Sequence, residues 1–465
     1  MLKRYFGNKQ FYKMALLVAV PIMIQNGITN FVGMVDNIMV GKVGTIEMTG
    51  VSIANTLIFV FNLAIFGAIS GAGIFTAQFY GSGDKKGMRE TFRFKFLVCL
   101  LLTAVGIAIF LLFGDDLIRR YLQGEGELAD IEGSFRAGRE YLLIMLIGLF
   151  PFALVQCYSG TLRETGQTVV PMTAGIVSVI INLILNYILI FGRFGAPRLG
   201  VRGAAIATVV SRFAELFIVS IWTARHKEEA PFIEDAFRSV RISGALLKSI
   251  LLKGMPLLIN ETLWAGGMAL LVQCYSLRSY NVVSATNISN TLTNVFSVAF
   301  IAMGSAIGII VGQQLGAGET EKARDTDRKL IVFSLLLTVV IAGVSVAFAW
   351  VFPKIYNTTD EIRSLATKFI LVYAACMPIN CFANAAYFTM RSGGKTFITF
   401  LFDSFFVCTV SVPAAFLLAH FTNIPIIPLY TIVNALDLLK CAVGFSLIRR
   451  GVWVNNIVTS QVNAE

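Results

Sequence analysis

Charged residues are scarce in this chain of 465 amino acids. They make up 14% of the sequence, whereas hydrophobic residues make up 56% and the mean hydropathy is +0.75. The interior of a water-soluble fold cannot bury such a large apolar fraction, so the composition excludes an ordinary soluble protein. We expect the lipid bilayer to be its solvent.

Histidine is nearly absent, and cysteine follows no pattern. His226 and His420 are the two histidines, and the seven cysteines lie in apolar stretches without CxxC or CxxH spacing. Such cysteines are packing residues, so we expect neither a disulfide framework nor a metal site. We also find no nucleophile–base set, and we therefore expect no enzyme activity and no cofactor. The net charge of +11 is scattered over short loops, so no nucleic-acid partner is expected.

Long apolar runs, by contrast, are abundant. A membrane-spanning helix needs about 20 mainly apolar residues. Twelve such runs occur, at about residues 14–40, 51–79, 94–113, 138–160, 168–192, 202–224, 250–275, 284–312, 330–352, 366–390, 397–420 and 425–448. The fold class is therefore an all-α polytopic membrane protein with twelve transmembrane helices.

The distribution of Lys and Arg between the loops predicts the orientation of these helices. About twice as many basic residues fall on the side of the N-terminus as on the opposite side. Cytoplasmic loops carry this excess, so we expect both termini in the cytoplasm of a bacterium and the chain in its inner membrane. The long polar stretch at 226–246 is then a cytoplasmic linker between an N-lobe (1–225) and a C-lobe (247–465).

The two halves are copies of each other. Residues 51–90 match residues 286–325 at 14 of 40 positions without a gap, a shift of 235 that also relates Pro21 to Pro256. Each half has six predicted helices, so both copies enter the membrane from the same side and the repeats are parallel. Two pseudo-symmetric six-helix bundles of this kind enclose a central cavity and can rock about it, as an alternating-access transporter does.

Several motifs along this frame indicate a family. They are "DNIMVGKVG" after the first run, the paired "QFYGSGD" and "QQLGAGE", "LRETGQTVVP", "NLILNYILIFG" and "GVRGAAIAT". In this order they resemble the MATE (multidrug and toxic compound extrusion) transporters over nearly the whole chain. The resemblance implies a V-shaped pair of bundles that exports amphipathic, often cationic compounds in exchange for inward H+ or Na+.

Asp36 is the formal charge inside the first apolar run. A carboxylate there costs about 2.5–3.5 kcal/mol on insertion scales, so intramembrane acids are functional candidates. One alternative is that Asp36 lies at the rim of the membrane, facing headgroups or Lys42. The other is that it faces a polar pocket and binds a proton or sodium ion.

Three further residues are candidate partners of Asp36. Asn182 and Asn186 are one helical turn apart in the fifth run, and Thr208 lies in the sixth. Their amide and hydroxyl oxygens suit a hard cation or a carboxylate. The MATE resemblance implies a cation site on these four positions, with possible Na+ at Asp36. Many relatives have a second aspartate where this chain has Asn186, and the lower charge favours protons.

Other polar groups in the apolar runs are less specific. Glu261 corresponds to Asn26 under the repeat shift, and this pair is a candidate for substrate contact or for a second polar site. Two pairs spaced i,i+3 are expected to neutralise each other, Arg212 with Glu215 and Asp437 with Lys440. Pro21 leaves a carbonyl unbonded and permits a kink, so it is the candidate helix bend that responds to Asp36.

Together these observations predict a monomeric secondary antiporter that exports amphipathic or cationic drugs by alternating access. The alternative is a flippase for lipid-linked precursors on a related two-lobed frame, although the strongly basic cavity that suits such a substrate is not evident. An intramembrane enzyme is a more distant alternative.

Overall fold

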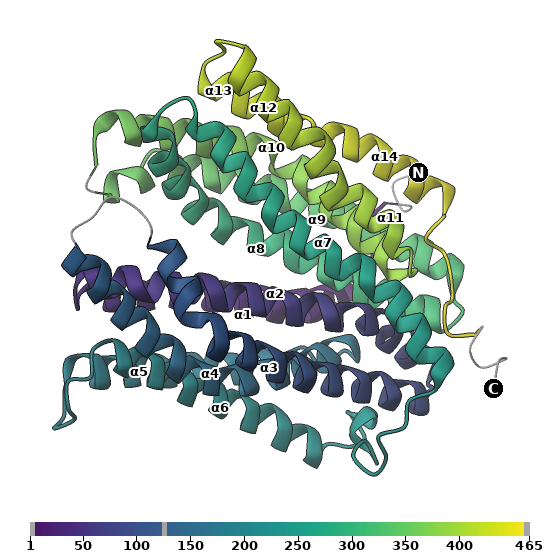
Figure 1. The fold of residues 1–465 in the computed structure, drawn as a ribbon. Coiled ribbons are helices and arrows are strands. Elements are labelled where there is room, and N and C mark those ends of the chain that lie inside the picture. The colour runs from purple at the N-terminus through teal and green to yellow at the C-terminus, as the bar shows by residue number, and fades with distance from the viewer. Residues whose placement is uncertain (1–4, 123–127, 357, 460–465) are drawn as a thin grey trace. The chain divides into compact units, whose positions relative to one another are not determined.

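The computed structural model describes residues 5–122, 128–356 and 358–459. The regular secondary structure of these residues is helical throughout (Figure 1). Twelve of the described helices are long and apolar enough to span a membrane, as predicted.

The first six of these helices, with the turn that follows them, are α1 (Lys9–Gly41), α2 (Thr45–Ser82), α3 (Lys85–Tyr121), α4 (Leu128–Glu164), α5 (Val169–Phe191), α6 (Val201–Arg225) and η2 (Pro231–Ile233). The next four, with their connecting turn, are α7 (Gly244–Ser276), α8 (Tyr280–Gly316), α9 (Thr320–Ala349), η3 (Phe352–Ile355) and α10 (Asp360–Ser392). The eleventh span consists of α11 (Thr396–Phe400), η4 (Leu401–Phe405), η5 (Val407–Ser411) and α12 (Val412–Phe421), and the twelfth of α13 (Ile426–Ala435) and α14 (Asp437–Arg450).

The helix boundaries reproduce the sequence repeat. Shifting α1 by 235 residues gives the bounds of α7, and the same shift carries the starts of α2 and α3 onto those of α8 and α9. Pro21 and Pro256 lie inside α1 and α7 at equivalent positions. The two halves therefore share their helical plan as well as their residues.

The eleventh span departs from the regular helix that its apolar sequence predicts. Two π-helical turns, η4 and η5, interrupt it before α12 begins. Pro413 follows them, and its ring nitrogen cannot donate the next regular hydrogen bond. The first of these turns carries Asp403, so the irregular backbone coincides with a charged residue.

The chain divides into two compact units. The second unit comprises residues 24–76 and 85–247, and in it α4 packs against α3 and α6 while α5 packs against α6. The first unit comprises the described residues of 1–23, 77–84 and 248–465, and in it α10 packs against α8, α9 and α14. The lobe and linker boundaries given above stay a prediction.

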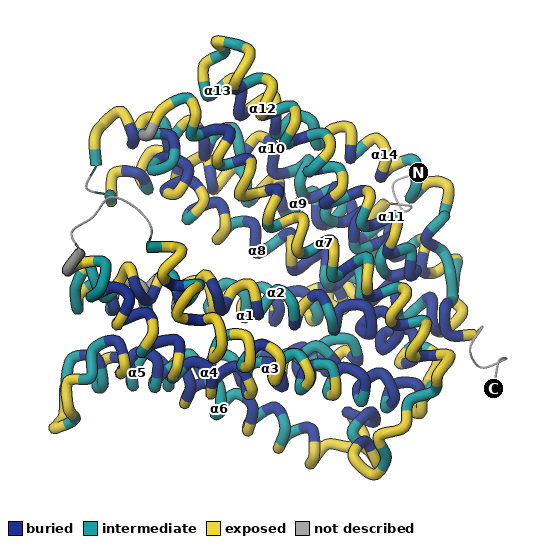
Figure 2. The backbone as a smooth tube through the Cα atoms, viewed as in Figure 1, coloured by how far each residue is buried: buried dark blue, intermediate teal, exposed yellow. Residues whose placement is uncertain are grey.

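Large apolar side chains are exposed along the helices, as lipid contact requires. Leu112 and Leu101 of α3 have exposed fractions of 74% and 62%. Figure 2 shows exposed positions alternating with buried ones along most helices. Such surfaces would destabilise a protein in water, and they fit the bilayer that the composition predicts.

The paired motifs "QFYGSGD" and "QQLGAGE" meet inside the first unit. A Cβ atom on Gly81 would lie 1.8 Å from the carbonyl oxygen of Gln313, and one on Gly316 would lie 1.9 Å from that of Gln78. The two backbones therefore touch reciprocally where glycine alone fits. The Gln78 amide also donates to the carbonyl oxygens of Ser392 (2.9 Å) and Asn455 (3.1 Å), which ties the end of α2 to the chain after α14.

Candidate functional site

The structure brings the four predicted cation-site residues into one polar network. Asn186 Nδ2 donates to Asp36 Oδ1 at 2.6 Å and lies 3.1 Å from Asn182 Oδ1. Asn182 Nδ2 in turn donates to Thr208 Oγ1 at 3.3 Å. Three helices, α1, α5 and α6, supply these side chains within the second unit.

The helix period explains why α5 supplies two members of this network. Asn182 and Asn186 are four residues apart, so both project from the same face of α5. Their exposed fractions are 4% and 1%. Ser178, one turn earlier, donates to the carbonyl oxygen of Ser211 on α6 at 2.8 Å and holds the two helices together.

Sequence reasoning missed two neighbours of this network. The buried hydroxyl group of Tyr141, from α4, lies beside Thr208 and beside Asn55 of α2. Asn55 carried a usable signal, because it recurs as Asn290 in the second half of the sequence. Tyr141 carried none, since a tyrosine in an apolar run is ordinary core.

The network offers oxygen atoms to a cation. Asn186 Oδ1 is buried and accepts no hydrogen bond among the described residues. One carboxylate, amide oxygens and a hydroxyl group suit a proton or a monovalent cation better than a divalent ion, which favours several charged ligands. Over the described part of the chain, no group of three or more His, Cys, Asp or Glu residues could hold a metal.

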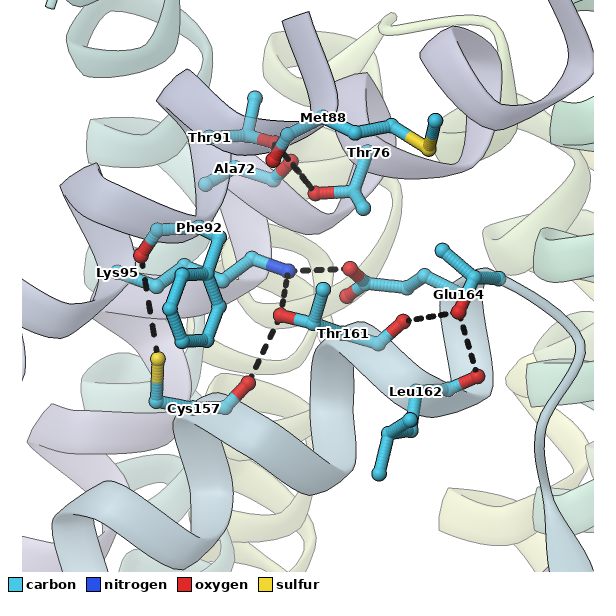
Figure 3. Close-up of polar contacts among 11 residues, drawn as sticks. Ala72, Thr76, Met88, Thr91, Phe92, Lys95, Cys157, Thr161, Leu162 and Glu164 are labelled. Atoms are coloured by element: carbon cyan, nitrogen blue, oxygen red, sulfur yellow. Dashed lines mark hydrogen bonds and ion pairs between the residues drawn. The ribbon is translucent and has the colours of Figure 1, made fainter. Parts of the chain in front are cut away.

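A second buried charged group in this unit was not predicted. Lys95 of α3 has an exposed fraction of 0%, and its ammonium group forms an ion pair with Glu164, the last residue of α4 (Figure 3). Lys95 Nζ also donates to Thr161 Oγ1 at 3.2 Å. Gly73 of α2 makes room for the pair, because a Cβ atom there would lie 2.3 Å from Glu164 Oε1.

The sequence offered no reason to bury Lys95. It follows the basic stretch that opens α3, and it counts there as one more loop cation. Figure 3 shows it pointing inward instead, toward α4, in a polar layer that includes the hydrogen bond of 3.1 Å between Thr76 and Thr91. Its partner is Glu164, the acid that ends "GTLRE" on α4, and a contact between two helices cannot be read from either segment alone.

One of the two expected neutralising pairs is formed. Lys440 Nζ lies 3.7 Å from Asp437 and 3.4 Å from Asp403. Arg212 and Glu215 form no direct ion pair within 4.0 Å in the described structure, but their charges still attract each other, so their mutual neutralisation stays a prediction. The Arg212 guanidinium also lies over the ring of Phe152, at 4.5 Å from its centroid.

The remaining predicted residues lie in separate units. Pro21 is buried inside α1, and the border between the units falls in the same helix, after Met23. Asn26, in the second unit, is half-buried. Glu261 of α7, in the first unit, is also half-buried, and the charged groups near it are Arg391 and Asp403.

Comparisons with known proteins agree on one family. The MatE family model matches residues 21–188 and 256–417. The chain is 26% identical over 422 residues to "Probable multidrug resistance protein YoeA" of Bacillus subtilis, covering 88% of both chains. It is 25% identical to "Probable multidrug resistance protein NorM" of Thermotoga maritima, covering 98% of this chain and 95% of the relative.

The fold also matches solved structures. One is described as the outward-facing conformation of a multidrug resistance MATE family transporter of the MOP superfamily. It superposes with a TM-score of 0.85 at 19% identity, covering 95% of each chain. A structure of MATE in the straight conformation gives the same TM-score over 97% of this chain and 98% of that one.

Proposed function

The chain belongs to the MatE family, and from this membership and the Asp36 network we propose that it is an antiporter that exports amphipathic or cationic drugs. Relatives named as multidrug resistance proteins, similar over almost their whole length, support the substrate class. The hydrogen bond between Asp36 and Asn186 supports ion coupling. It holds the carboxylate within the polar network, whose amide and hydroxyl oxygens could share a cation with it.

The coupling ion binds at Asp36 and changes the charge of the second unit. With Asp36 ionised, the network attracts a cation. When a proton or sodium ion neutralises the carboxylate, the Asn186 amide loses its charged acceptor and the hydrogen bond to α1 weakens. The site contains one carboxylate, whereas a bare Na+ ion favours a site with more negative charge. This composition supports the proton as the coupling ion.

In this proposal, neutralisation of Asp36 is followed by a bend of α1 at Pro21. A proline inside a helix cannot donate to the carbonyl four residues earlier, so α1 has a weak point there. Release of Asp36 from α5 allows the part of α1 that follows Pro21 to move. Bound drug is then disfavoured and leaves outward, while the ion leaves on the cytoplasmic side.

The membrane potential drives this exchange. One elementary charge moving inward yields about 2.3 kcal/mol per 100 mV. Since about 1.4 kcal/mol corresponds to a factor of ten, this supports a gradient of some tens-fold for a neutral drug. The proposal includes a monomer in a bacterial inner membrane, with both termini in the cytoplasm and no cofactor.

Reconstitution in liposomes tests the proposal. Purified protein, a fluorescent cationic dye, and separately imposed H+ and Na+ gradients give the coupling ion and the direction together. We expect an imposed H+ gradient to drive the dye in the direction opposite to the proton flow. A Na+ gradient alone should move little dye. Dye movement that is independent of both gradients would contradict antiport. Transport of a lipid-linked sugar in place of the dye would favour the flippase.

A further inference from the structure

A basic pocket lies where the first turns of α3 meet the segment that follows α6. Its volume is about 450 Å³, and both walls belong to the second unit. Four basic and two acidic residues are among those that line it: Lys86, Arg89, Arg93 and Arg238, with Glu90 and Asp235. The cation-site network described above contains none of these residues.

Two side chains, Arg93 and Glu90, hold the far wall of the pocket in place. Arg93 donates to the carbonyl oxygens of Asp235 and Ala236, each at 2.7 Å, and to that of Arg241 at 3.1 Å. Glu90 accepts a hydrogen bond of 2.8 Å from the backbone of Ser243. The N–H groups of Arg93 and the carboxylate of Glu90 therefore already have partners in the segment that follows α6.

The basic groups that remain indicate an anionic ligand. Arg89 Nε is buried and donates no hydrogen bond to any described residue. Neither Arg89 nor Arg238 forms an ion pair with an acid in the part of the chain that the structure describes. An unpaired guanidinium facing a pocket is a ready donor to phosphate oxygens, which it binds with two N–H groups.

The start of the apolar run of α3 indicates that the pocket lies near the lipid headgroups. The apolar run of α3 begins at Phe94, directly after Arg93, so Lys86 and Arg89 precede the hydrocarbon core by one to two helical turns. Beside the pocket, Phe237 and Val240 have exposed fractions of 60% and 69%. Apolar side chains exposed next to basic ones are typical of a segment resting on the membrane interface.

We propose that this pocket binds the phosphate headgroup of an anionic phospholipid. Arg89 and Arg238 contact the phosphate, and Phe237 and Val240 lie among the acyl chains. The exposed apolar pair favours a lipid over free phosphate, which has no apolar part. The proposal needs the bilayer alone and does not depend on ion coupling at Asp36.

Lipid retention measured by native mass spectrometry tests the proposal. The full chain is purified in detergent and titrated with phosphatidylglycerol or with phosphatidylcholine. The wild type is expected to retain one phosphatidylglycerol molecule. R89Q/R238Q should bind it roughly thirtyfold more weakly, because each basic residue near an anionic surface raises the affinity about five- to sixfold. The single variant R238Q, at an exposed position, is expected to lose part of this affinity without disturbing the fold.

The matched control is R449Q/R450Q, which removes two exposed charges at the end of α14. It should retain phosphatidylglycerol like the wild type, and V240S should lower the retention of phosphatidylglycerol. Equal retention by R89Q/R238Q and the wild type, or equal loss in the control, would overturn the proposal. Displacement of the lipid by inorganic phosphate at millimolar concentration would equally overturn it, in favour of a free-anion site.

Discussion

At the scale of single residues, the feature on which the proposed function depends is one carboxylate held by an amide. Asp36 accepts from Asn186, and Asn182 and Thr208 continue the chain of hydrogen bonds across α5 and α6. An aspartate in this position is costly in lipid, and its neighbours lower that cost by offering polar groups. Asp36 was predictable, because it is the formal charge inside the first apolar run, and the MATE resemblance indicated its three partners.

Replacing Asn186 by Asp tests the charge argument. The variant N186D places a second carboxylate beside Asp36, so the site attracts cations more strongly. We expect the apparent affinity for Na+, measured as the Na+ dependence of dye efflux, to rise by about tenfold or more. The control N434D adds an acid to α13 in the other unit, and an equal rise there would contradict a local effect.

The ion pair of Lys95 and Glu164 gives a second prediction at this scale. Lys95 is fully buried, whereas the Glu164 side chain is 18% exposed. Breaking the pair from the acid side leaves an uncompensated ammonium group without water, so E164Q should lower the free energy of unfolding by about 3–5 kcal/mol.

Thermal unfolding in detergent measures this loss. The variant K95M leaves the partly exposed acid and should cost less than E164Q, while K95M/E164Q should recover most of the stability. Equal losses for both single variants, or an additive loss in the double variant, would show that the pair is not coupled as the geometry indicates.

At the scale of elements, α1 and α7 are the informative pair. They have equivalent bounds and equivalent internal prolines, but α1 carries Asp36 where α7 carries Leu271. A bend that responds to an ion is therefore expected in α1 alone. The same proline in α7 should be a static kink.

The variants P21A and P256A separate these two roles. Removing proline from a helix interior straightens it and stabilises it by up to about 3 kcal/mol. If bending of α1 belongs to the cycle, P21A should reduce ion-driven dye efflux by about tenfold or more, while P256A stays close to wild type. Equal effects of both substitutions on efflux would contradict a special role of Pro21.

Helices were the most predictable elements, and their interruptions were the least. Apolar length located all twelve spans, because a bilayer imposes that length on any helix that crosses it. The π-helical turns around Asp403 were not foreseen, since they come from a shift in backbone hydrogen bonds that residue type does not encode. The inward orientation of Lys95 was missed for a related reason, because its partner lies on another helix.

At the scale of the whole molecule, the repeat explains the shared helical plan, and the differences between its two copies support the proposed function. The two halves share a helical plan, yet the carboxylate network around Asp36 has no counterpart at Leu271. A symmetric frame in which the Asp36 site is present in one half suits a cycle in which that half responds to the ion. The roles of Asp36 and its partners follow from that asymmetry and stay a prediction.

The most direct measurement is ion-driven efflux by the variant D36N in liposomes, beside D116N, which makes the same chemical change at an exposed position of α3. Both should fold and insert like the wild type, as shown by their thermal unfolding. We predict that D36N loses efflux driven by either gradient, while D116N retains it. Wild-type efflux by a correctly inserted D36N would contradict the central claim.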